Sequence, residues 1–430
     1  MLLPRLKELE QAGNPITIGV VGGGQMGEGL VAQTELMHGM RVMALSDVVT
    51  GRAFEVLQAA GIPSSNIVET NDPDIAAQAI SEGRRVAGID PELAWAGSVD
   101  VVVEATGIPE VGASVAYGAL LAQKHVIQMN VETDATVGWL LRRMAKASNL
   151  VYTLSAGDEP GAAMELFDFA TSLGFTVVSA GKGKNNPLDR SATPDSVAEK
   201  AKSQMMNPKM LASFVDGSKT MVEMTALANA TGLVPDVRGM HGPEATPSTI
   251  ATTYIPKADG GVFSGEGRVD YGLGIAPGVF VVITAQHPKI IRDLKYLQLG
   301  PGPYWSLYRP YHLTSLETPI SIARAVLDGD TTAATDETPT AETVAVAKRD
   351  LHAGEVIDGL GGYCSYGMIE TARTAHQSRM LPLGLAPGAT LTNEVPMGNS
   401  ITYDDVELDE NLTIVHLRRL QDLELRGAYQ

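Results

Sequence analysis

A buried-type strand that runs directly into a glycine-rich turn constrains the fold more than any other feature of this sequence. Residues 16–21, ITIGVV, form a continuous apolar and β-branched run, which is typical of a strand buried on both faces of a sheet. The next residues carry the pattern G-x-G-x-x-G at Gly22, Gly24 and Gly27 and open a helical spacing. In this context the turn brings a helix N-terminus to an anionic pyrophosphate. The stretch therefore predicts a dinucleotide-binding unit, and the alternative is a glycine-rich turn without a ligand.

An acidic residue ends the second predicted strand, which covers residues 41–47. Asp47 lies 20 residues after Gly27, where a carboxylate accepts hydrogen bonds from ribose hydroxyls and repels a 2′-phosphate. We therefore expect NAD as the cofactor, with NADP as the alternative because Arg52 follows closely; a simple helix N-cap is the other interpretation of Asp47. Thr106, Gly107 and Asn130 lie at the ends of two later strands and are candidate nicotinamide neighbours, although roles in turns or caps are equally open for them. The full set of candidate cofactor-binding residues is Gly22, Gly24, Gln25, Met26, Gly27, Asp47, Arg52, Thr106, Gly107 and Asn130.

Strand-like and helix-like segments alternate over the first part of the chain. Apolar runs at 100–107, 125–130 and 150–157 are separated by helical spacings, which predicts a parallel sheet with crossover helices. The expected fold class is therefore α/β. The predicted divisions are a Rossmann doubly wound parallel sheet in 1–155, an α+β domain in 156–330, a small, polar, proline-containing linker in 331–343 and a small β-rich domain in 344–430.

Composition and charge exclude two classes of partner. The chain has 32 Lys and Arg against 50 Asp and Glu, a formal net charge of −18, which opposes binding to nucleic acid or to an anionic membrane. No apolar run approaches the roughly 18 residues of a membrane-spanning helix, and the first residues are too charged for a signal peptide. The lone Cys364 fits a reducing compartment, so we expect a cytoplasmic protein.

A basic segment interrupts this acidic chain. Between residues 182 and 219 there are seven Lys or Arg and four acids, a local charge of +3, and the stretch GKGKNNPLDR at 181–190 begins it. A local positive field in an acidic protein suggests an anionic ligand, and the glycines beside Lys182 leave backbone N–H groups accessible. We therefore expect Lys182 and Lys184 to bind an anionic substrate; the alternative is a solvated loop.

The helix predicted near 218–231 carries residues suited to acid–base chemistry. Lys219 and Glu223 are four residues apart and share a helix face, but lysine before glutamate is the poorer order for helix stability. We therefore expect Lys219 to donate a proton to a substrate oxygen as hydride reaches the carbonyl carbon. Glu223 and Asp216 would orient Lys219 or hold a divalent cation. A surface ion pair is the alternative for Lys219 and Glu223.

Two further segments suit an anion or a metal. The stretch YRPYHLTSLE places His312 three residues after Arg309, with Ser315 just beyond. A guanidinium is the natural fork for phosphate or carboxylate, and a histidine binds anions or transfers protons. We therefore assign Arg309 and Ser315 to substrate binding and His312 to catalysis. Asp158 and Glu159 follow the predicted strand at 150–157 and are candidate metal ligands, although acids also suit the first turn of a helix.

The order of the longer motifs resembles a known family. The motifs GVVGGGQMG, ATGIPEVGA, SAGDEP, SAGKGKNNP, DGSKTMVEM, GMHGP and RPYHLTSLE are similar to those of homoserine-dehydrogenase-like oxidoreductases with a C-terminal SAF domain, which include the 1-deoxy-D-xylulose 5-phosphate reductoisomerase-like enzymes of isoprenoid biosynthesis. The resemblance implies a Rossmann domain, a catalytic and dimerisation domain, an SAF-like domain and a nicotinamide cofactor. For the reductoisomerase-like members it also implies a phosphorylated ketose and a divalent metal. The matching positions are Lys182, Lys184, Asn185, Ser218, Lys219, Arg309 and His312.

Three functional hypotheses follow. The first is an NAD(P)-dependent dehydrogenase, reductase or reductoisomerase that acts on a small anionic hydroxy-carbonyl substrate. For a reductoisomerase this substrate would be phosphorylated. We expect the enzyme to be a homo-oligomer, either a dimer or a tetramer. Asp47 departs from the NADPH-using reductoisomerase-like members, which carry basic residues after the second strand. The second is homoserine dehydrogenase, although the basic segment disfavours a substrate with an ammonium group. The third is a non-catalytic regulatory protein that responds to a nicotinamide nucleotide.

Overall fold

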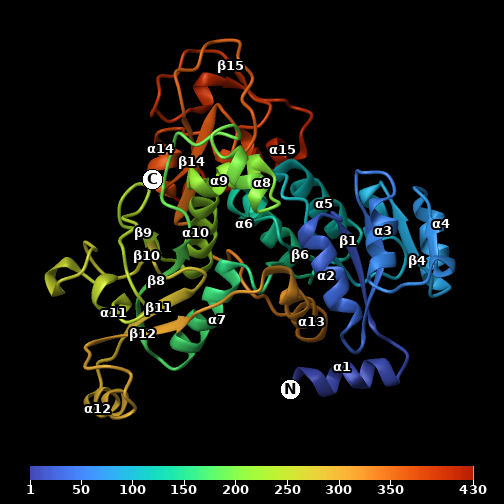
Figure 1. Cartoon of the computed structure of the whole chain (residues 1–430), viewed down its shortest axis with the longest axis horizontal. Helices are drawn as coiled ribbons and strands as arrows, with labels where there is room; N and C mark the ends of the chain where they lie inside the picture. Colours follow the sequence, from blue (N-terminus) through green and yellow to red (C-terminus); the bar gives the residue numbers. More distant parts are fainter. Residues whose placement is uncertain (430) are drawn as a thin grey trace. The chain divides into compact units, whose positions relative to one another are not determined.

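The chain forms two compact units. The computed structural model describes residues 1–429, in which Met1–Asp158 and Leu313–Ala334 gather into a first unit (Figure 1). The second unit holds Glu159–His312 and the residues from Thr335 onward. The chain therefore enters the second unit at Glu159, returns to the first unit for Leu313–Ala334, and enters the second unit again at Thr335.

A seven-stranded sheet with the order β3-β4-β2-β1-β5-β6-β7 forms the centre of the first unit. Every neighbouring pair is parallel, which confirms the predicted α/β fold with a Rossmann-type sheet. Because β2 and β5 lie on opposite sides of β1, the strand order reverses beside β1, and ligands of such folds bind at this position. The strands are β1 (Ile16–Val21), β2 (Met40–Ser46), β3 (Ile67–Glu69), β4 (Arg85–Gly88), β5 (Val101–Glu104), β6 (His125–Gln128) and β7 (Tyr152–Leu154).

Helices pack on this sheet through two apolar clusters. In one cluster Ile18 and Val20 of β1 contact residues of α2, α3 and α13; in the other Val86 of β4 packs with α4 and Leu93. Full burial of such a side chain contributes about 1.5–3 kcal/mol, so the continuous apolar strands stabilise the sheet from both faces. The helices of this unit are α1 (Leu2–Gln11), α2 (Gln25–Glu35), α3 (Arg52–Ala59), α4 (Pro73–Ser81), α5 (Pro109–Leu121), α6 (Val131–Ala147) and α13 (Thr318–Asp328).

A five-stranded mixed sheet with the order β12-β11-β8-β10-β9 supports the second unit. Its strands are β8 (Thr176–Lys184), β9 (Val234–Pro235), β10 (Arg268–Leu273), β11 (Val279–Thr284) and β12 (Tyr304–Arg309). β8, β9 and β10 run parallel, whereas β11 and β12 are antiparallel to their neighbours. The helices α7 (Glu159–Ser172) and α10 (Ser218–Thr231) contact the sheet and each other. Side chains on the face toward α7 and α10 therefore lie where helix residues can reach them.

Alternate residues of β11 separate the two faces of this second sheet. Val279 and Val281 join the apolar cluster that includes Ala162 of α7, whereas Phe280 joins a cluster with Tyr254. This period of two is the pattern of a strand with both faces covered. Smaller helices complete this part of the unit, namely α8 (Ala198–Ser203), α9 (Pro208–Val215), α11 (Ile250–Thr253) and α12 (Pro288–Tyr296).

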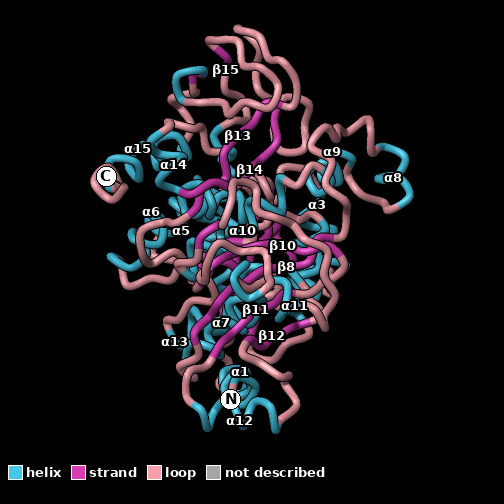
Figure 2. Tube along the Cα trace, turned by 90° about the vertical axis from the view of Figure 1, so that its left-hand side faces the viewer, coloured by secondary structure: helices cyan, strands magenta, loops and turns pink. Residues whose placement is uncertain are grey.

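The C-terminal part of the second unit is a β-rich segment with two helices. An antiparallel hairpin of β13 (Ala341–Ala347) and β14 (Ser365–Thr371) packs directly on α10, as Figure 2 shows. The remaining elements are α14 (Ala372–Gln377), β15 (Thr390–Leu391), β16 (Val406–Glu407) and α15 (Thr413–Glu424). None of the helices within residues 1–429 is long and apolar enough to cross a membrane.

The segment 331–343, which the sequence suggested as a linker, is mostly buried on both sides of an exposed stretch at 336–338. Thr332 and Ala333 are buried, and their backbone N–H groups both donate to Thr153 Oγ1 of β7, at 2.9 and 3.0 Å. Strand β13 already begins at Ala341. Small residues permit this close packing, and the same smallness gave the sequence its linker-like composition.

Candidate functional site

The glycine turn lies between β1 and α2 and requires glycine at two positions. Gly22 has φ +103°, and a Cβ there would lie 2.9 Å from the backbone of Ala105. A Cβ at Gly27 would lie 1.8 Å from the carbonyl oxygen of Gly22. Gly24 is the N-cap of α2, and a Cβ there would have no atom within 4 Å. The turn is therefore closed toward the sheet and open at Gly24, which is the geometry that admits a pyrophosphate.

Asp47 and Arg52 both brace this turn through Gly23. The Gly23 N–H donates to Asp47 Oδ2 at 2.7 Å, and Arg52 Nε donates to the Gly23 carbonyl at 2.8 Å. Arg52 also forms an ion pair with Glu28 of α2 at 2.6 Å. The predicted acidic residue therefore lies against the turn, while the charge of the nearby arginine is already offset by a carboxylate.

A buried acid that sequence reasoning missed lies at the carboxyl end of β5. Glu104 is fully buried, and its Oε1 accepts hydrogen bonds from the backbone N–H of Thr106, at 2.8 Å, and from the Thr106 hydroxyl. Burial raises the pKa of Glu104 to about 7, although the bonds from Thr106 and Asn130 oppose this. The signal in the sequence was a glutamate that ends an otherwise apolar strand, VVVE.

The other predicted cofactor neighbours lie at the same sheet edge. Asn130 is buried and caps α6, where its side chain accepts from the Thr133 N–H at 3.2 Å. Gly107 has φ +70° and follows the turn that Glu104 anchors. Gln25 and Met26 open α2. The carboxyl edge of β1, β5 and β6 therefore gathers the candidate cofactor residues within the first unit.

Lys182 of β8 is the centre of a charged cluster in the second unit. Its Nζ forms ion pairs with Glu159 of α7, at 2.5 Å, and with Glu223 of α10; the Lys182 and Glu223 side chains are 8% and 3% exposed. Burial alone would lower the pKa of Lys182, but the two carboxylates outweigh burial and raise it. Burial and the nearby Glu159 raise the pKa of Glu223, against the opposing charges of Lys182 and Lys219. The cluster thus holds a permanent cation beside a carboxyl group that protonates readily.

A second cation lies in line with Lys182 on the same sheet face. Val279 pairs with Lys182 on one side and with Arg309 on the other, so the side chains of all three point to the face covered by α7. Arg309 Nη1 contacts Glu165 of α7 at 3.0 Å. Helix α7 therefore supplies one carboxylate to each cation of this row.

The next predicted residues divide into two groups, and all of them except Asp158, which ends the first stretch of the first unit, belong to the second unit. His312 Nε2 lies 3.6 Å from Glu159 Oε1, so it joins the Lys182 cluster. Lys219 is half-buried in the first turn of α10, and Asn185 is exposed just after β8. Of the candidate metal ligands, Glu159 opens α7 and Asp158 immediately precedes it. These five residues stay candidates for contact with a substrate or ion.

Three other predicted residues make internal contacts. Lys184 Nζ donates to the main-chain carbonyls of Asn186 and Phe214, at 2.6 and 2.7 Å, and burial lowers its pKa to about 8. Ser218 Oγ accepts from a backbone N–H, and Asp216 forms a buried ion pair rather than contacting a ligand site. Sequence reasoning could not see these partners because they come from other segments.

Ser315 belongs to a different part of the molecule from the residues with which the sequence grouped it. The boundary between the units falls between His312 and Leu313, and Ser315 packs in the first unit. It is buried, and a Cβ at Gly29 of α2 would lie 2.8 Å from its Oγ. Its hydroxyl therefore lies against α2.

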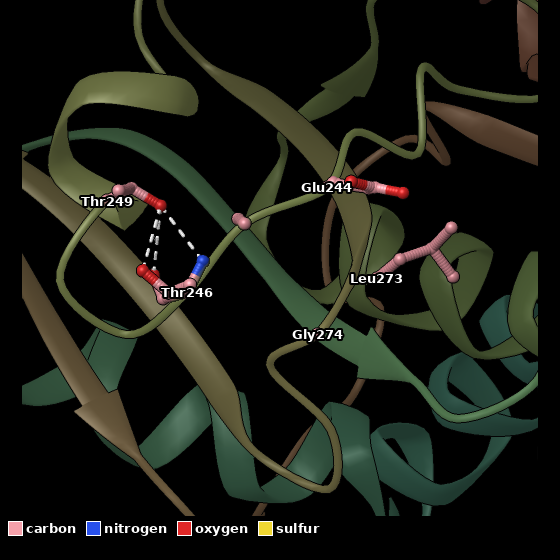
Figure 3. A pocket seen from close by; sticks show the side chains of 6 residues that line it. Glu244, Thr246, Thr249, Leu273 and Gly274 are labelled. Carbon is pink, nitrogen blue, oxygen red and sulfur yellow. Dashed lines mark hydrogen bonds between the residues drawn. The ribbon is translucent and has the colours of Figure 1, made fainter.

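A cavity of about 440 Å³ opens at the carboxyl end of β10 (Figure 3). Leu273, which lines it, pairs with Lys184 at the end of the parallel strand β8, so both lie at one sheet edge. The Thr246 N–H donates to Thr249 Oγ1 at 2.9 Å and fixes one wall. The lining residues are Glu244, Ala245, Thr246, Thr249, Leu273 and Gly274.

Comparison with known proteins finds a family model that is similar to part of the chain. Residues 157–318 match the family model described as the catalytic domain of oxidoreductase DRL. These residues contain Glu159, Lys182, Glu223, Arg309 and His312, so the charged cluster lies within the segment that is similar to that family model. No curated protein matches the sequence.

Several solved structures have a partly similar backbone. One is a probable dehydrogenase from Thermotoga maritima, with 13% identity, a TM-score of 0.42, and coverage of 73% of this chain and 90% of the other. Another is scyllo-inositol dehydrogenase from Lactobacillus casei with bound NAD(H), with 14% identity, a TM-score of 0.36, and coverage of 63% and 73%. A third is myo-inositol dehydrogenase from Lactobacillus casei with NAD(H) and myo-inositol, with 13% identity, a TM-score of 0.34, and coverage of 70% and 68%. At these TM-scores the similarity does not extend to a cofactor or a substrate.

Proposed function

We propose that this protein is an NAD(P)-dependent oxidoreductase that transfers hydride to or from a small anionic hydroxy-carbonyl compound. One observation carries the proposal: Lys182 is buried between Glu159 and Glu223 within the segment that matches an oxidoreductase catalytic domain. Burial of several charges is costly, and groups with strongly perturbed pKa values cluster at functional sites. A charged cluster of this kind suits proton transfer during hydride chemistry.

The proposed cofactor is NAD, bound at the glycine turn. Open space at Gly24 fits a pyrophosphate, and the backbone N–H groups at the start of α2 favour an anion. A 2′-phosphate would lie near the carboxylate of Asp47, whereas Arg52 is already paired with Glu28. These contacts support NAD over NADP.

The residues of the cluster divide the proton chemistry among them. A bound nicotinamide would supply or accept the hydride. In the reductive direction Lys219 donates its proton to the substrate carbonyl oxygen. Glu223, one helical turn further along α10, then returns a proton to Lys219, because its raised pKa keeps a proton available. Lys182 stays charged and holds Glu223 in place.

The anionic end of the substrate is assigned to the cations at the ends of β8 and β12. Lys184 Nζ is held by two main-chain carbonyls, so it is assigned to attract the anion through its charge and not through direct contact. Arg309 has a half-exposed partner in Glu165, and a substrate carboxylate or phosphate competes with that partner for the guanidinium. Asn185 and His312 lie on the same segments and complete the proposed binding set.

A divalent cation is a further element of the proposal. Asp158 and Glu159 are adjacent in sequence, and His312 contributes an imidazole near Glu159. Such a mixed donor set suits Mn²⁺ or Zn²⁺. Either ion should raise the melting temperature of the wild type but not of Glu159→Gln, since binding to the native state alone stabilises it.

A substrate panel tests the activity directly. Absorbance of the reduced nicotinamide is followed with phosphosugars, sugar acids and homoserine, each with NADH and NADPH or with the oxidised forms. We expect turnover with a phosphosugar or a sugar acid, and greater thermal stabilisation by NADH than by NADPH. Turnover with homoserine alone, or none with any compound, would contradict the proposal. Stronger stabilisation by NADPH would contradict the role of Asp47.

A further inference from the structure

Helix α10, which carries Lys219 and Glu223, is held on one side by the C-terminal hairpin. Figure 2 shows α10 between the five-stranded sheet and β13–β14. The Gly367 N–H of β14 donates to Ser218 Oγ at 2.7 Å, and Thr225 and Thr343 share a hydrogen bond of 2.7 Å. These links are buried and distributed along the helix. The hairpin therefore contacts the helix that forms one wall of the charged cluster.

A buried ion pair marks the start of this helix. Asp216 Oδ2 lies 2.7 Å from Lys348 Nζ, just beyond the end of β13, and the two side chains are 0% and 2% exposed. Lys348 Nζ also donates to the carbonyls of Ala192 and Gly362, at 2.7 and 2.8 Å. The ammonium group therefore donates to two carbonyls and forms an ion pair with Asp216.

The same carboxylate also binds the first turn of α10. Asp216 Oδ1 accepts from the Ser218 N–H at 2.8 Å, and Gly217 between them has φ +86° and is the N-cap of the helix. One side chain thus connects Lys348 to the turn in which Lys219 lies. A shift of Lys348 would move the helix start, because packed interiors transmit displacements rather than absorb them.

We infer that Lys348 is a positioning residue, which sets Lys219 and Glu223 of α10 against Lys182 through its buried contact with Asp216. The inference rests on the proposed function for its catalytic consequence. The C-terminal residues from Thr335 onward are then a part of the catalytic unit, and not a separate appendage, because they fix the helix that carries the proton-transfer groups.

A second buried ion pair in the same segment provides a matched control. Arg418 of α15 contacts Glu342 of β13 at 2.6 Å, and both side chains are 10% exposed. This pair links β13 to α15, two C-terminal elements. Glu342→Gln therefore removes a comparable buried charge without touching the Asp216 contact.

The decisive experiment compares Lys348→Met, Glu342→Gln and the double variant Asp216→Asn/Lys348→Met. We expect Lys348→Met to lower kcat by roughly 10- to 100-fold with little change in KM or in cofactor affinity, whereas Glu342→Gln keeps kcat within about twofold. In the double variant no buried charge lacks a partner, so its melting temperature should recover while kcat stays low. Recovery of kcat together with stability would show a purely structural role and overturn the inference.

Hydrogen exchange tests the same inference without a substrate. Amides at the start of α10 should exchange at least about tenfold faster in both Lys348 variants than in Glu342→Gln. Equal exchange in all three variants would overturn the inference. If the wild type turns over no compound, the proposed function fails, but the exchange result still decides whether Lys348 fixes α10.

Discussion

The glycine turn of the first unit and the Lys182 cluster of the second unit are built in opposite ways. The turn is made of backbone: Gly22 and Gly27 allow a close approach that any side chain would block. The cluster is made of side chains, since Lys182, Glu159 and Glu223 come from three elements and balance one another's charge. A backbone site depends on local conformation, whereas a charge cluster depends on tertiary packing. The two should therefore respond differently to substitution.

The largest effect should come from the cluster. Lys219→Met removes the proposed proton donor, so we expect kcat to fall by roughly 10²- to 10⁴-fold while cofactor affinity stays unchanged. Lys202→Met, an exposed position of α8 in the same basic segment, is the matched control and should keep kcat. Steady-state kinetics and cofactor titration measure both quantities. An equal loss in the two variants, or none in Lys219→Met, would remove the catalytic role.

The next effect separates two glycines of the turn. Gly22→Ala places a side chain at φ +103° and against the Ala105 backbone, so we expect a loss of about 1–3 kcal/mol in unfolding free energy together with weaker cofactor binding. Gly24→Ala has open space and φ −68°, so the fold should be unaffected while the added methyl group weakens cofactor binding. Thermal melting and cofactor titration distinguish the two. Unchanged affinity in Gly24→Ala would contradict a pyrophosphate at the turn.

This contrast also explains how much the sequence could predict. The Rossmann-type sheet and the glycine turn followed from short-range patterns, because strand burial and turn geometry are encoded within a few residues. Lys182 was predicted to bind an anionic substrate, but its two carboxylate partners were not predicted. Glu159 was interpreted as a metal ligand and Glu223 as a partner of Lys219, whereas both contact Lys182. Pairing across elements has no local signature in one sequence.

Burial was the other property that the sequence did not reveal. Asp216 was predicted to orient Lys219 or to hold a divalent cation, and only the fold shows that Lys348, more than 100 residues away, is its partner. Segment 331–343 looked like a linker because small polar residues suit both solvated spacers and tight packing. Glu104 was not predicted as a site residue, because an acid at the end of a strand is unusual only when the strand end is buried, as it is here.

A pH effect on stability should follow from Glu104 in the first unit. Its folded-state pKa of about 7 lies above the ordinary glutamate value of 4.5, so its contribution to stability is present below pH 4.5 and is lost as the pH rises through 7. The unfolding free energy of the wild type should decrease between pH 4.5 and 8 because Glu104 ionises. In Glu104→Gln this decrease should be smaller by up to about 3 kcal/mol. Glu69→Gln, the exposed last residue of β3, is the control and should leave the pH dependence unchanged.

The smallest effect should come from the outer pair of the charged row. Glu165 and Arg309 are 36% and 14% exposed, so Glu165→Gln should cost less than about 1 kcal/mol of unfolding free energy, because solvent screens such a pair. The same change removes the carboxylate that competes with an anionic substrate for Arg309. KM for that substrate should therefore fall, by up to about fivefold, while kcat stays constant. The decrease in KM should become smaller as salt is added, since salt screens the attraction between Arg309 and the anionic substrate. A rise in KM would mean that Glu165 orients Arg309 for the substrate, and the two cations of the row would then be equally dependent on their carboxylate partners.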